Sequence, residues 1–212
     1  EKGYADSMRC VSTGYGRACV SYADKQLTEI SCHGRGANSL FQDSCLIVDI
    51  GGQDTKIIRI KDGQVVDFLM NDKCAAGTGK FIEVMAERLG GSLDALYELA
   101  RKGKALPISS MCTVFAESEV IGHIGSGKPR EDIAAGVIAS VAERVAAMVA
   151  RFQEEKEIML TGGLCQSEYF IKIFEQTTRK KVITHDFARY AGALGAALVA
   201  ANKRRIDIGA KP

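Results

Sequence analysis

The stretch CLIVDIGGQDTKIIRIKDGQVVDFLM, residues 45–70, decides the fold that this sequence predicts. A first apolar run, 45–50, ends in two glycines, and a second run covers 55–60. The Asp62-Gly63 pair then leads into a third run, 64–70, in which apolar and polar residues largely alternate. An Asp-Gly pair between two such runs is typical of a tight β-hairpin. The stretch therefore predicts an antiparallel meander of three strands.

The rest of the chain alternates between helical and extended patterns around this meander. Helical periodicity downstream predicts helices at 79–89, 93–102, 113–124, 130–152, 168–177 and 190–203, with strands at 157–161 and 181–184. Upstream we expect a strand at 7–13 and a helix at 22–31, followed by a polar, glycine-containing loop at 33–39. This order of elements predicts a mixed α/β fold, and it differs from a Rossmann unit, in which parallel strands alternate with helices from the start.

Charge and cysteine usage exclude several classes of function. The chain has 28 basic and 26 acidic residues, well mixed, so its formal net charge is only +2. This balance gives no electrostatic reason to expect nucleic acid or a membrane surface as a partner. No apolar run approaches the roughly 20 residues that a transmembrane helix needs. Seven cysteines, none closer than nine positions to another, form neither a disulfide framework nor a CxxC zinc ribbon, and they favour a reducing, cytoplasmic location.

Two glycine-containing segments are candidate nucleotide loops. In DIGGQDTK, 49–56, the amides of Gly51 and Gly52 could face phosphate oxygens, while Asp49 or Asp54 could hold water on Mg²⁺. The alternative for this segment is a plain β-turn capped by Asp49. The second segment is TGG, 161–163, with the small-residue run GALGAAL at 192–198. Small residues there would leave room for an adenine ring or let a helix pack closely, and the sequence leaves both alternatives open.

The segment MNDKCAAGTGKF, residues 70–81, resembles a Walker A loop but does not match it. That motif needs a glycine where Cys74 stands and Ser or Thr where Phe81 stands. Cys74 precedes one predicted helix, and Cys112 directly precedes another. The partial positive charge of a helix N-terminus lowers the pKa of a thiol and stabilises a thiolate. An iron–sulfur cluster usually takes four thiolates, and a two-fold dimer could supply two from each chain.

The other candidate ligands have no partners at ligand spacing in the sequence. Five further cysteines, at 10, 19, 32, 45 and 165, are expected to be structural, and the three histidines, at 33, 123 and 185, are isolated.

Taken in order, the motifs resemble one family. DIGGQDTK, MNDKCAAGTGKF, ISSMCTVFAESEV, MLTGG and GALGAAL look like those of the ATP-dependent activators of 2-hydroxyacyl-CoA dehydratases. This group includes the ATPase subunits of benzoyl-CoA reductase. Upstream, TGYGR and ADKQLTEISCH are similar to the family as well, so the resemblance covers about residues 11–199.

The resemblance implies a fold and a division into lobes. The fold is α/β, an actin/hexokinase-like (ribonuclease H-like) two-lobed ATPase fold. Residues 1–44 and 190–212 would form the remainder of the N-terminal lobe with a returning C-terminal helix, and 45–189 the second lobe. The family's first phosphate loop, D-x-G-S/T, does not occur in this sequence, so we expect the first strands of the N-terminal lobe to be absent from this chain.

The resemblance also implies site residues and cofactors. Cys74 and Cys112 of each of two subunits would bind one shared [4Fe-4S] cluster in a homodimer. The other cofactors would be ATP or ADP and Mg²⁺. The implied catalytic residues are Asp49, Gln53 and Asp54, and the implied nucleotide-binding residues are Gly51, Gly52, Gly162 and Gly163.

The implied activity is ATP-driven transfer of one electron. The donor would be a ferredoxin or flavodoxin, and the acceptor a 2-hydroxyacyl-CoA dehydratase or a related iron–sulfur reductase. Two alternatives differ in class: a small-molecule kinase or ATPase of the same fold without a cluster, and a non-enzymatic module that only dimerises through a cluster.

Overall fold

A five-stranded mixed sheet forms the centre of the structure, in the order β5-β4-β3-β6-β7. The computed structural model describes residues 9–41, 45–109 and 112–207, with side chains up to residue 201. The strands are β3 (Cys45–Ile50), β4 (Thr55–Lys61), β5 (Gln64–Asn71), β6 (Glu157–Gly162) and β7 (Lys181–Ile183). Strands β3 to β5 pair antiparallel, while β6 runs parallel to β3 and β7 parallel to β6. The predicted meander is confirmed.

The hairpin between β4 and β5 follows the expected turn chemistry. Asp62 has φ 51° and Gly63 φ 72°, both in the left-handed region. Two consecutive residues of this kind twist the chain in the sense that flanking strands require, which is why Asp-Gly is favoured there.

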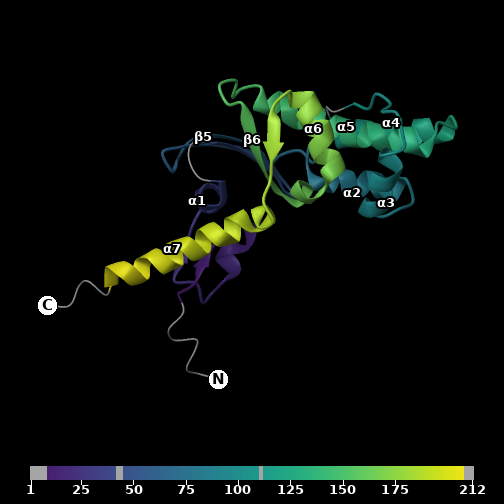
Figure 1. The fold of residues 1–212 in the computed structure, drawn as a ribbon. Helices are drawn as coiled ribbons and strands as arrows, with labels where there is room; N and C mark the ends of the chain where they lie inside the picture. Colours follow the sequence, from purple (N-terminus) through teal and green to yellow (C-terminus); the bar gives the residue numbers. More distant parts are fainter. Residues whose placement is uncertain (1–8, 42–44, 110–111, 208–212) are drawn as a thin grey trace.

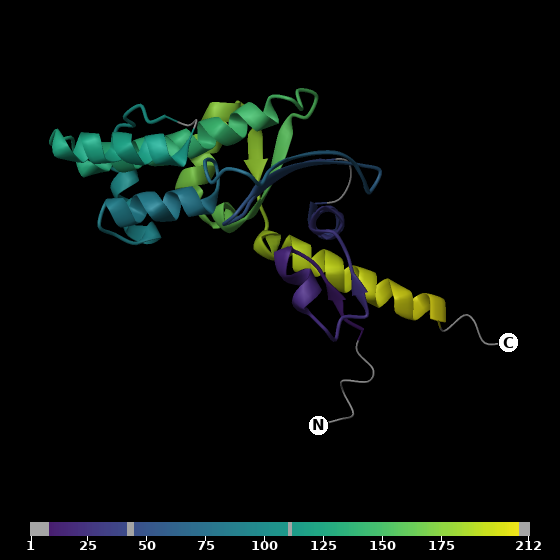
Figure 2. The same ribbon diagram turned by 180° about the vertical axis from the view of Figure 1, so that it is seen from behind.

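Helices cover both faces of the sheet (Figures 1 and 2). One face, with Leu46, Val48 and Ile57, joins the larger core. The helices on that side are α2 (Gly79–Arg88), α3 (Leu93–Ala100), α4 (Thr113–Gly125), α5 (Arg130–Val149) and α6 (Glu168–Thr178). The opposite face, with Ile47 and Ile58, packs on a smaller core beside α1 (Glu29–Phe41) and α7 (Ala191–Asp207). Alternation of side chains along each strand explains how one apolar stretch supplies two cores.

The N-terminal segment lies beside α7 (Figure 1). Here β1 (Val11–Ser12) pairs parallel with β2 (Lys25–Gln26), and the 3-10 helix η2 (Tyr15–Cys19) connects them. Of the strand predicted at 7–13, only Val11–Ser12 is confirmed: residues 9, 10 and 13 are not in a strand, and residues 7 and 8 lie outside the described ranges. The division into lobes at 44/45 and 189/190 stays a prediction.

The prediction for residues 22–39 was wrong except at 29–31, which are helical as expected. Helix α1 begins at Glu29 and includes the segment 33–39, which the sequence predicted as a loop. The reason is packing against α7: a Cβ at Gly36 would lie 1.8 Å from the carbonyl oxygen of Ala191, and one at Gly195 would lie 1.7 Å from that of Cys32. The glycines lower helix propensity but let the two helix backbones touch, so tertiary contact overrides the local preference.

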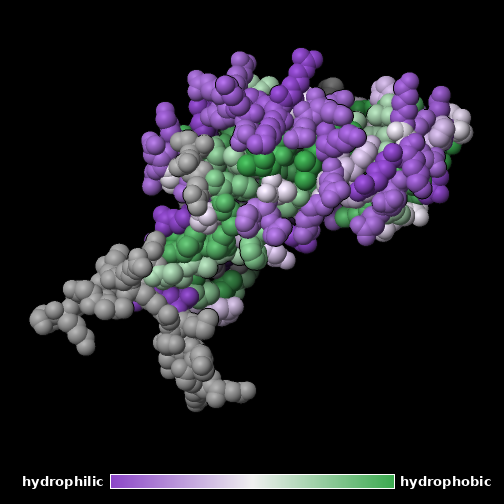
Figure 3. Space-filling view, viewed as in Figure 1, coloured by the Kyte–Doolittle hydropathy of each residue, from purple (hydrophilic) through white to green (hydrophobic). Residues whose placement is uncertain are grey.

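Hydrophilic side chains cover most of the upper part of the surface in Figure 3, and hydrophobic ones gather near its middle and along α7. Among the described residues, no helix combines the length and apolar character that crossing a membrane requires.

Candidate functional site

The turn between β3 and β4 carries the segment that the sequence predicted as a phosphate loop. The Gly51 amide donates to the Asp54 carbonyl over 2.9 Å and closes the turn. Gly52 and Gln53 are exposed at the tip, whereas Asp49 and Asp54 are each 4% exposed. Asp49 does not cap the turn, because its carboxylate bonds to other side chains. The loop therefore presents backbone at its tip above two buried carboxylates.

Lys56 lies among three carboxylates at the base of this loop. Its Nζ is 2.5 Å from Asp54 Oδ1, 2.9 Å from Glu29 Oε1 and 3.4 Å from Asp49 Oδ2. The side chain is almost fully buried. Burial by itself lowers the pKa of Lys56, but the Asp49 charge and the hydrogen bonds to Asp54 and Glu29 outweigh it and raise the pKa overall. Lys56 thus carries a fixed positive charge beneath the phosphate loop.

The same carboxylates fit a divalent cation. Oxygen atoms of Glu29, Asp49 and Asp54 lie within 4.8 Å of one another. Three carboxylates around one ammonium leave an excess of negative charge, and carboxylate oxygen is the ligand type that Mg²⁺ prefers. Because Lys56 Nζ already contacts all three carboxylates, a Mg²⁺ ion here would have to take most of its ligands from water and phosphate, as Mg²⁺ commonly does.

A chain of buried hydrogen bonds connects the two candidate loops. Thr161 Oγ1 donates to Asp49 Oδ1 over 3.1 Å, and His33 Nε2 lies 2.8 Å from the same hydroxyl. Across the site, Tyr15 Oη donates to Asp54 Oδ2 over 3.0 Å. Nothing in the spacing of the sequence indicated that Tyr15 or His33 belongs here.

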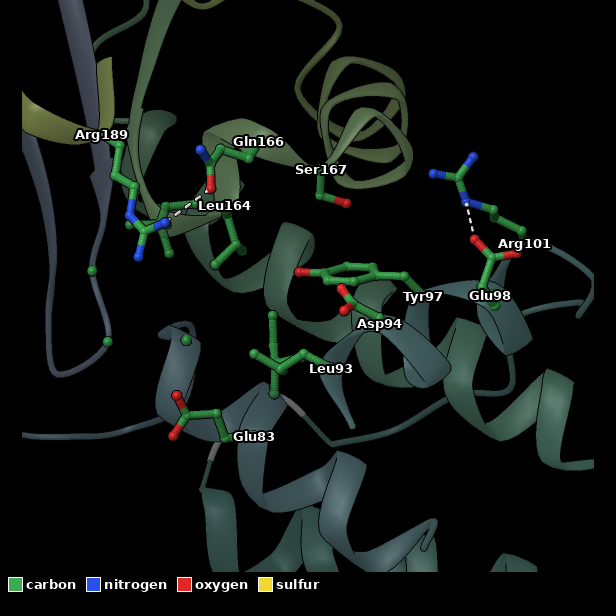
Figure 4. Close-up of a pocket in the computed structure, with 16 residues that line it drawn as sticks. Glu83, Leu93, Asp94, Tyr97, Glu98, Arg101, Leu164, Gln166, Ser167 and Arg189 are labelled. Atoms are coloured by element: carbon green, nitrogen blue, oxygen red, sulfur yellow. Dashed lines mark hydrogen bonds and ion pairs between the residues drawn. The ribbon is translucent and has the colours of Figure 1, made fainter. Parts of the chain in front are cut away.

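A cavity of about 590 Å³ opens beside the phosphate loop (Figure 4). Gly51, Gly52 and Gly163 line it, together with the N-terminal part of α2 and residues along the whole length of α3. Its volume lies within the range of small-molecule sites. Arg189 Nη1 donates to Gln166 Oε1 over 3.2 Å at the rim, and the Tyr97 ring extends into the space between Leu93 and Ser167. The sequence analysis missed these rim residues, which come from three separate elements.

The glycines of the second candidate loop have different roles. Gly163 lines the cavity and has open space where a Cβ would stand. Gly162 has φ 81°, and a Cβ there would lie 2.3 Å from the Ile50 carbonyl oxygen, so it lets β6 pass close to β3. The GALGAAL run lies in α7, where Gly195 permits the close contact with α1. Of its two alternatives, the structure supports helix packing.

The two cysteines have unlike surroundings. Cys112 is the N-cap residue of α4, as the sequence predicted, and it is half-buried. Cys74 is half-buried in the loop between β5 and α2, four positions before the N-cap Thr78. Two of the amides that begin α2, those of Gly79 and Lys80, donate to the carbonyls of Gly51 and Gly52. Helices α2 and α4 pack together, and Arg88 Nε bonds Glu117 Oε1 between them.

Two of the other cysteines are held as neutral thiols. Burial raises the pKa of Cys45 to about 11 and also raises that of Cys165. Both side chains are buried, in agreement with a structural role.

Solved structures place this architecture in the actin/hexokinase-like class of ATPases. The chain superposes on the activator of 2-hydroxyisocaproyl-CoA dehydratase from Clostridium difficile, solved with bound ADPNP, with a TM-score of 0.88, 40% identity and coverage of 95% of this chain and 76% of that one. A ROK family glucokinase from Streptomyces griseus shares the fold alone, with a TM-score of 0.51, 11% identity and coverage of 86% and 70%.

The chain belongs to the BadF/BadG/BcrA/BcrD ATPase family, whose model matches residues 2–200. It is 45% identical to the (R)-2-hydroxyglutaryl-CoA dehydratase activating ATPase of Acidaminococcus fermentans over 200 residues, 93% of this chain and 77% of that protein. It is 49% identical to YjiL of Escherichia coli, a protein named as uncharacterized, over 188 residues, 88% of this chain and 74% of that protein.

Proposed function

We propose that this protein is an ATP-driven one-electron activator. It takes an electron from a ferredoxin or flavodoxin and passes it, through a [4Fe-4S] cluster shared by two copies of the chain, to a 2-hydroxyacyl-CoA dehydratase or a related iron–sulfur reductase. The relatives named as dehydratase activators support this choice of partner.

The observation that carries the proposal is a direct connection between the phosphate loop and the Cys74 loop. Gly79 N donates to Gly51 O and Lys80 N donates to Gly52 O, each over 2.9 Å. A nucleotide that shifts the glycine tip therefore acts on the segment that follows Cys74. Nucleotide can drive such a change only by binding one arrangement more tightly than the other.

At the nucleotide, the chain supplies charge and backbone. Gly51 and Gly52 would offer amides to the phosphates, Gln53 lies at the exposed tip, and Asp49 and Asp54 would hold Mg²⁺, which would neutralise phosphate charge. Gly163 lines the side where adenosine would lie, and Gly162 contributes indirectly by letting β6 pass close to β3. Two contacts join the proposed N-terminal lobe to the phosphate loop: the hydrogen bond between Tyr15 and Asp54 and the ion pair between Glu29 and Lys56. Closure of the proposed lobes (1–44 with 190–212, and 45–189) would therefore change these two contacts.

At the proposed cluster site, each chain offers two free thiols as iron ligands. Cys74 and Cys112 are free and half-buried, and their two helices pack together in one chain. A [4Fe-4S] cluster, which stores and transfers one electron, takes four thiolates, so two copies of the chain related by a two-fold axis would complete it.

The test is anaerobic purification followed by analysis of iron, mass in solution and ATP turnover. We expect about four iron atoms per two chains. Cys74→Ser and Cys112→Ser should each lose the iron and dissociate into monomers while keeping nucleotide binding. Cys19→Ser changes an exposed cysteine and serves as the control.

Retention of the full iron content in either ligand variant would refute the cluster assignment. An iron-free wild-type protein that phosphorylates a small acceptor would instead identify a kinase of the same fold. Iron-dependent dimers without any ATP turnover would identify a dimerisation module.

A further inference from the structure

One cross-strand pair holds the loop that carries Cys74. Thr55 on β4 lies opposite Asn71 on β5 in the sheet register. Thr55 Oγ1 donates to the Gly77 carbonyl over 2.6 Å, and Asn71 Nδ2 donates to the carbonyls of Cys74 and Ala76, each over 2.9 Å. Three side-chain hydrogen bonds from one position of the sheet thus fix the backbone of the loop.

The same pair adjoins the phosphate loop. Thr55 follows Asp54 directly, and its partner in the β3–β4 register is Ile50, the residue before the glycine tip. Thr55 is fully buried, so its hydroxyl cannot exchange the Gly77 carbonyl for water. Gly77 itself has φ 85°, and a Cβ there would lie 2.8 Å from the Arg144 side chain. The loop therefore has little freedom to adopt another path beside the sheet.

We propose that Thr55 and Asn71 are positioning residues that transmit the nucleotide state of the phosphate loop to Cys74. The proposal rests on the proposed function, because it assigns a role to nucleotide at the glycine tip. Two routes leave the tip: the amides of Gly79 and Lys80 on the helix side, and Thr55 with Asn71 on the sheet side. With both in place, a shift of the tip moves the loop as a unit. Without the hydrogen bonds of Thr55 and Asn71, only those of Gly79 and Lys80 connect the tip to this segment, and the backbone at Cys74 no longer follows the tip.

Thr55→Val is the informative variant because it keeps the shape of the side chain and removes only the hydroxyl. Thr55→Ser restores the hydroxyl and should restore function. Asn71→Leu removes the donors at the other position of the pair. Thr178→Val is the matched control, since Thr178 Oγ1 makes a similar bond, over 2.7 Å, to the Phe174 carbonyl in α6.

The readout is the alkylation rate of Cys74 in the full chain purified without cluster. Iodoacetamide is added with and without ADP or ADPNP plus Mg²⁺, and the modified peptide is quantified by mass spectrometry. In wild-type protein, nucleotide should change the Cys74 rate by about fivefold or more, the lower end of coupling between protein sites. In Thr55→Val and Asn71→Leu that ratio should fall close to one, with nucleotide affinity retained. Thr55→Ser and Thr178→Val should keep it, and the buried Cys45 provides an unreactive reference in every sample.

Two results would overturn the inference: a wild-type protein that binds nucleotide with no change at Cys74, and a Thr55→Val protein with the full wild-type ratio. A chain that never acquires iron but still shows the nucleotide-dependent rate would refute the electron-transfer function and leave this inference standing.

Discussion

Lys56 brings a buried positive charge into contact with three carboxylates, two of them also buried. Removing one partner of such a group is costly, because the remaining charges stay buried without compensation. We expect Lys56→Met to lower the free energy of unfolding by about 3–5 kcal/mol at pH 7. Urea denaturation followed by circular dichroism would measure the loss. Lys61→Met, at the exposed end of the same strand, is the control and should stay within about 0.5 kcal/mol of wild type.

The contribution of Lys56 should also depend on pH in a defined direction. Its pKa is raised in the folded protein, since the carboxylates outweigh the opposing effect of burial. A raised pKa stabilises the fold fully below the unfolded value of about 10.4, and this stabilisation is lost as pH rises through the folded value. The difference between wild type and Lys56→Met should therefore stay constant from about pH 7 to 10 and narrow above that. A difference that disappears below pH 9 would contradict this account.

Among single residues, the sequence indicated those next to each glycine turn. It missed those that are distant in the sequence and come close to the site only in the folded structure. Asp49, Asp54 and Gly163 lie at the ends of strands or directly beside them, as the sequence predicted. His33 and Thr161 are 128 positions apart, and only the packing of α1 on the sheet joins them.

Among the elements, the contact between α1 and α7 depends on glycines that replace side chains with backbone. Gly195→Ala would drive a methyl group into the Cys32 carbonyl, and the helices would have to separate. We expect a loss of about 1–3 kcal/mol or more in the free energy of unfolding, the usual cost of overpacking. Differential scanning calorimetry would show the corresponding fall in Tm.

The matched control for this prediction is Gly122→Ala in α4. A Cβ at Gly122 meets no atom within 4 Å, and the residue is exposed. The same substitution should there raise stability by about 0.5–1 kcal/mol, because alanine is the better helix former. Equal effects of the two substitutions would mean that helix propensity, and not packing, decides both.

For the molecule as a whole, the cavity beside the phosphate loop is built from the ends of several elements. Gly163→Leu would add a side chain to its lining, at a position where a Cβ meets no atom within 4 Å. We expect the free energy of unfolding without nucleotide to stay near that of wild type. Wild-type protein with nucleotide at 100 times Kd should gain about 2.7 kcal/mol by mass action, and the variant should lose most of this gain.

Thermal shift titrations with ATP and ADP in the presence of Mg²⁺ would test this prediction. Gly122→Leu, at an open position of α4 away from the cavity, controls for the added bulk. Undiminished stabilisation of Gly163→Leu by nucleotide would show that the nucleotide binds elsewhere.

The sequence by itself determined the meander, the position of the turn between β3 and β4, and most helices, since strand alternation, Asp-Gly turns and helical periodicity act over a few residues. Only the tertiary structure decided that residues 33–39 are helical, that Gly162 and GALGAAL serve packing, and that Lys56, Glu29 and His33 join the carboxylates. These outcomes depend on atoms brought together from distant segments, and burial there strengthens electrostatic and hydrogen-bond interactions that a local pattern does not encode. The hydrogen bonds between the phosphate loop and the Cys74 loop also depend on tertiary structure. Two strands and a helix must come together before Thr55, Asn71 and Gly79 can form them.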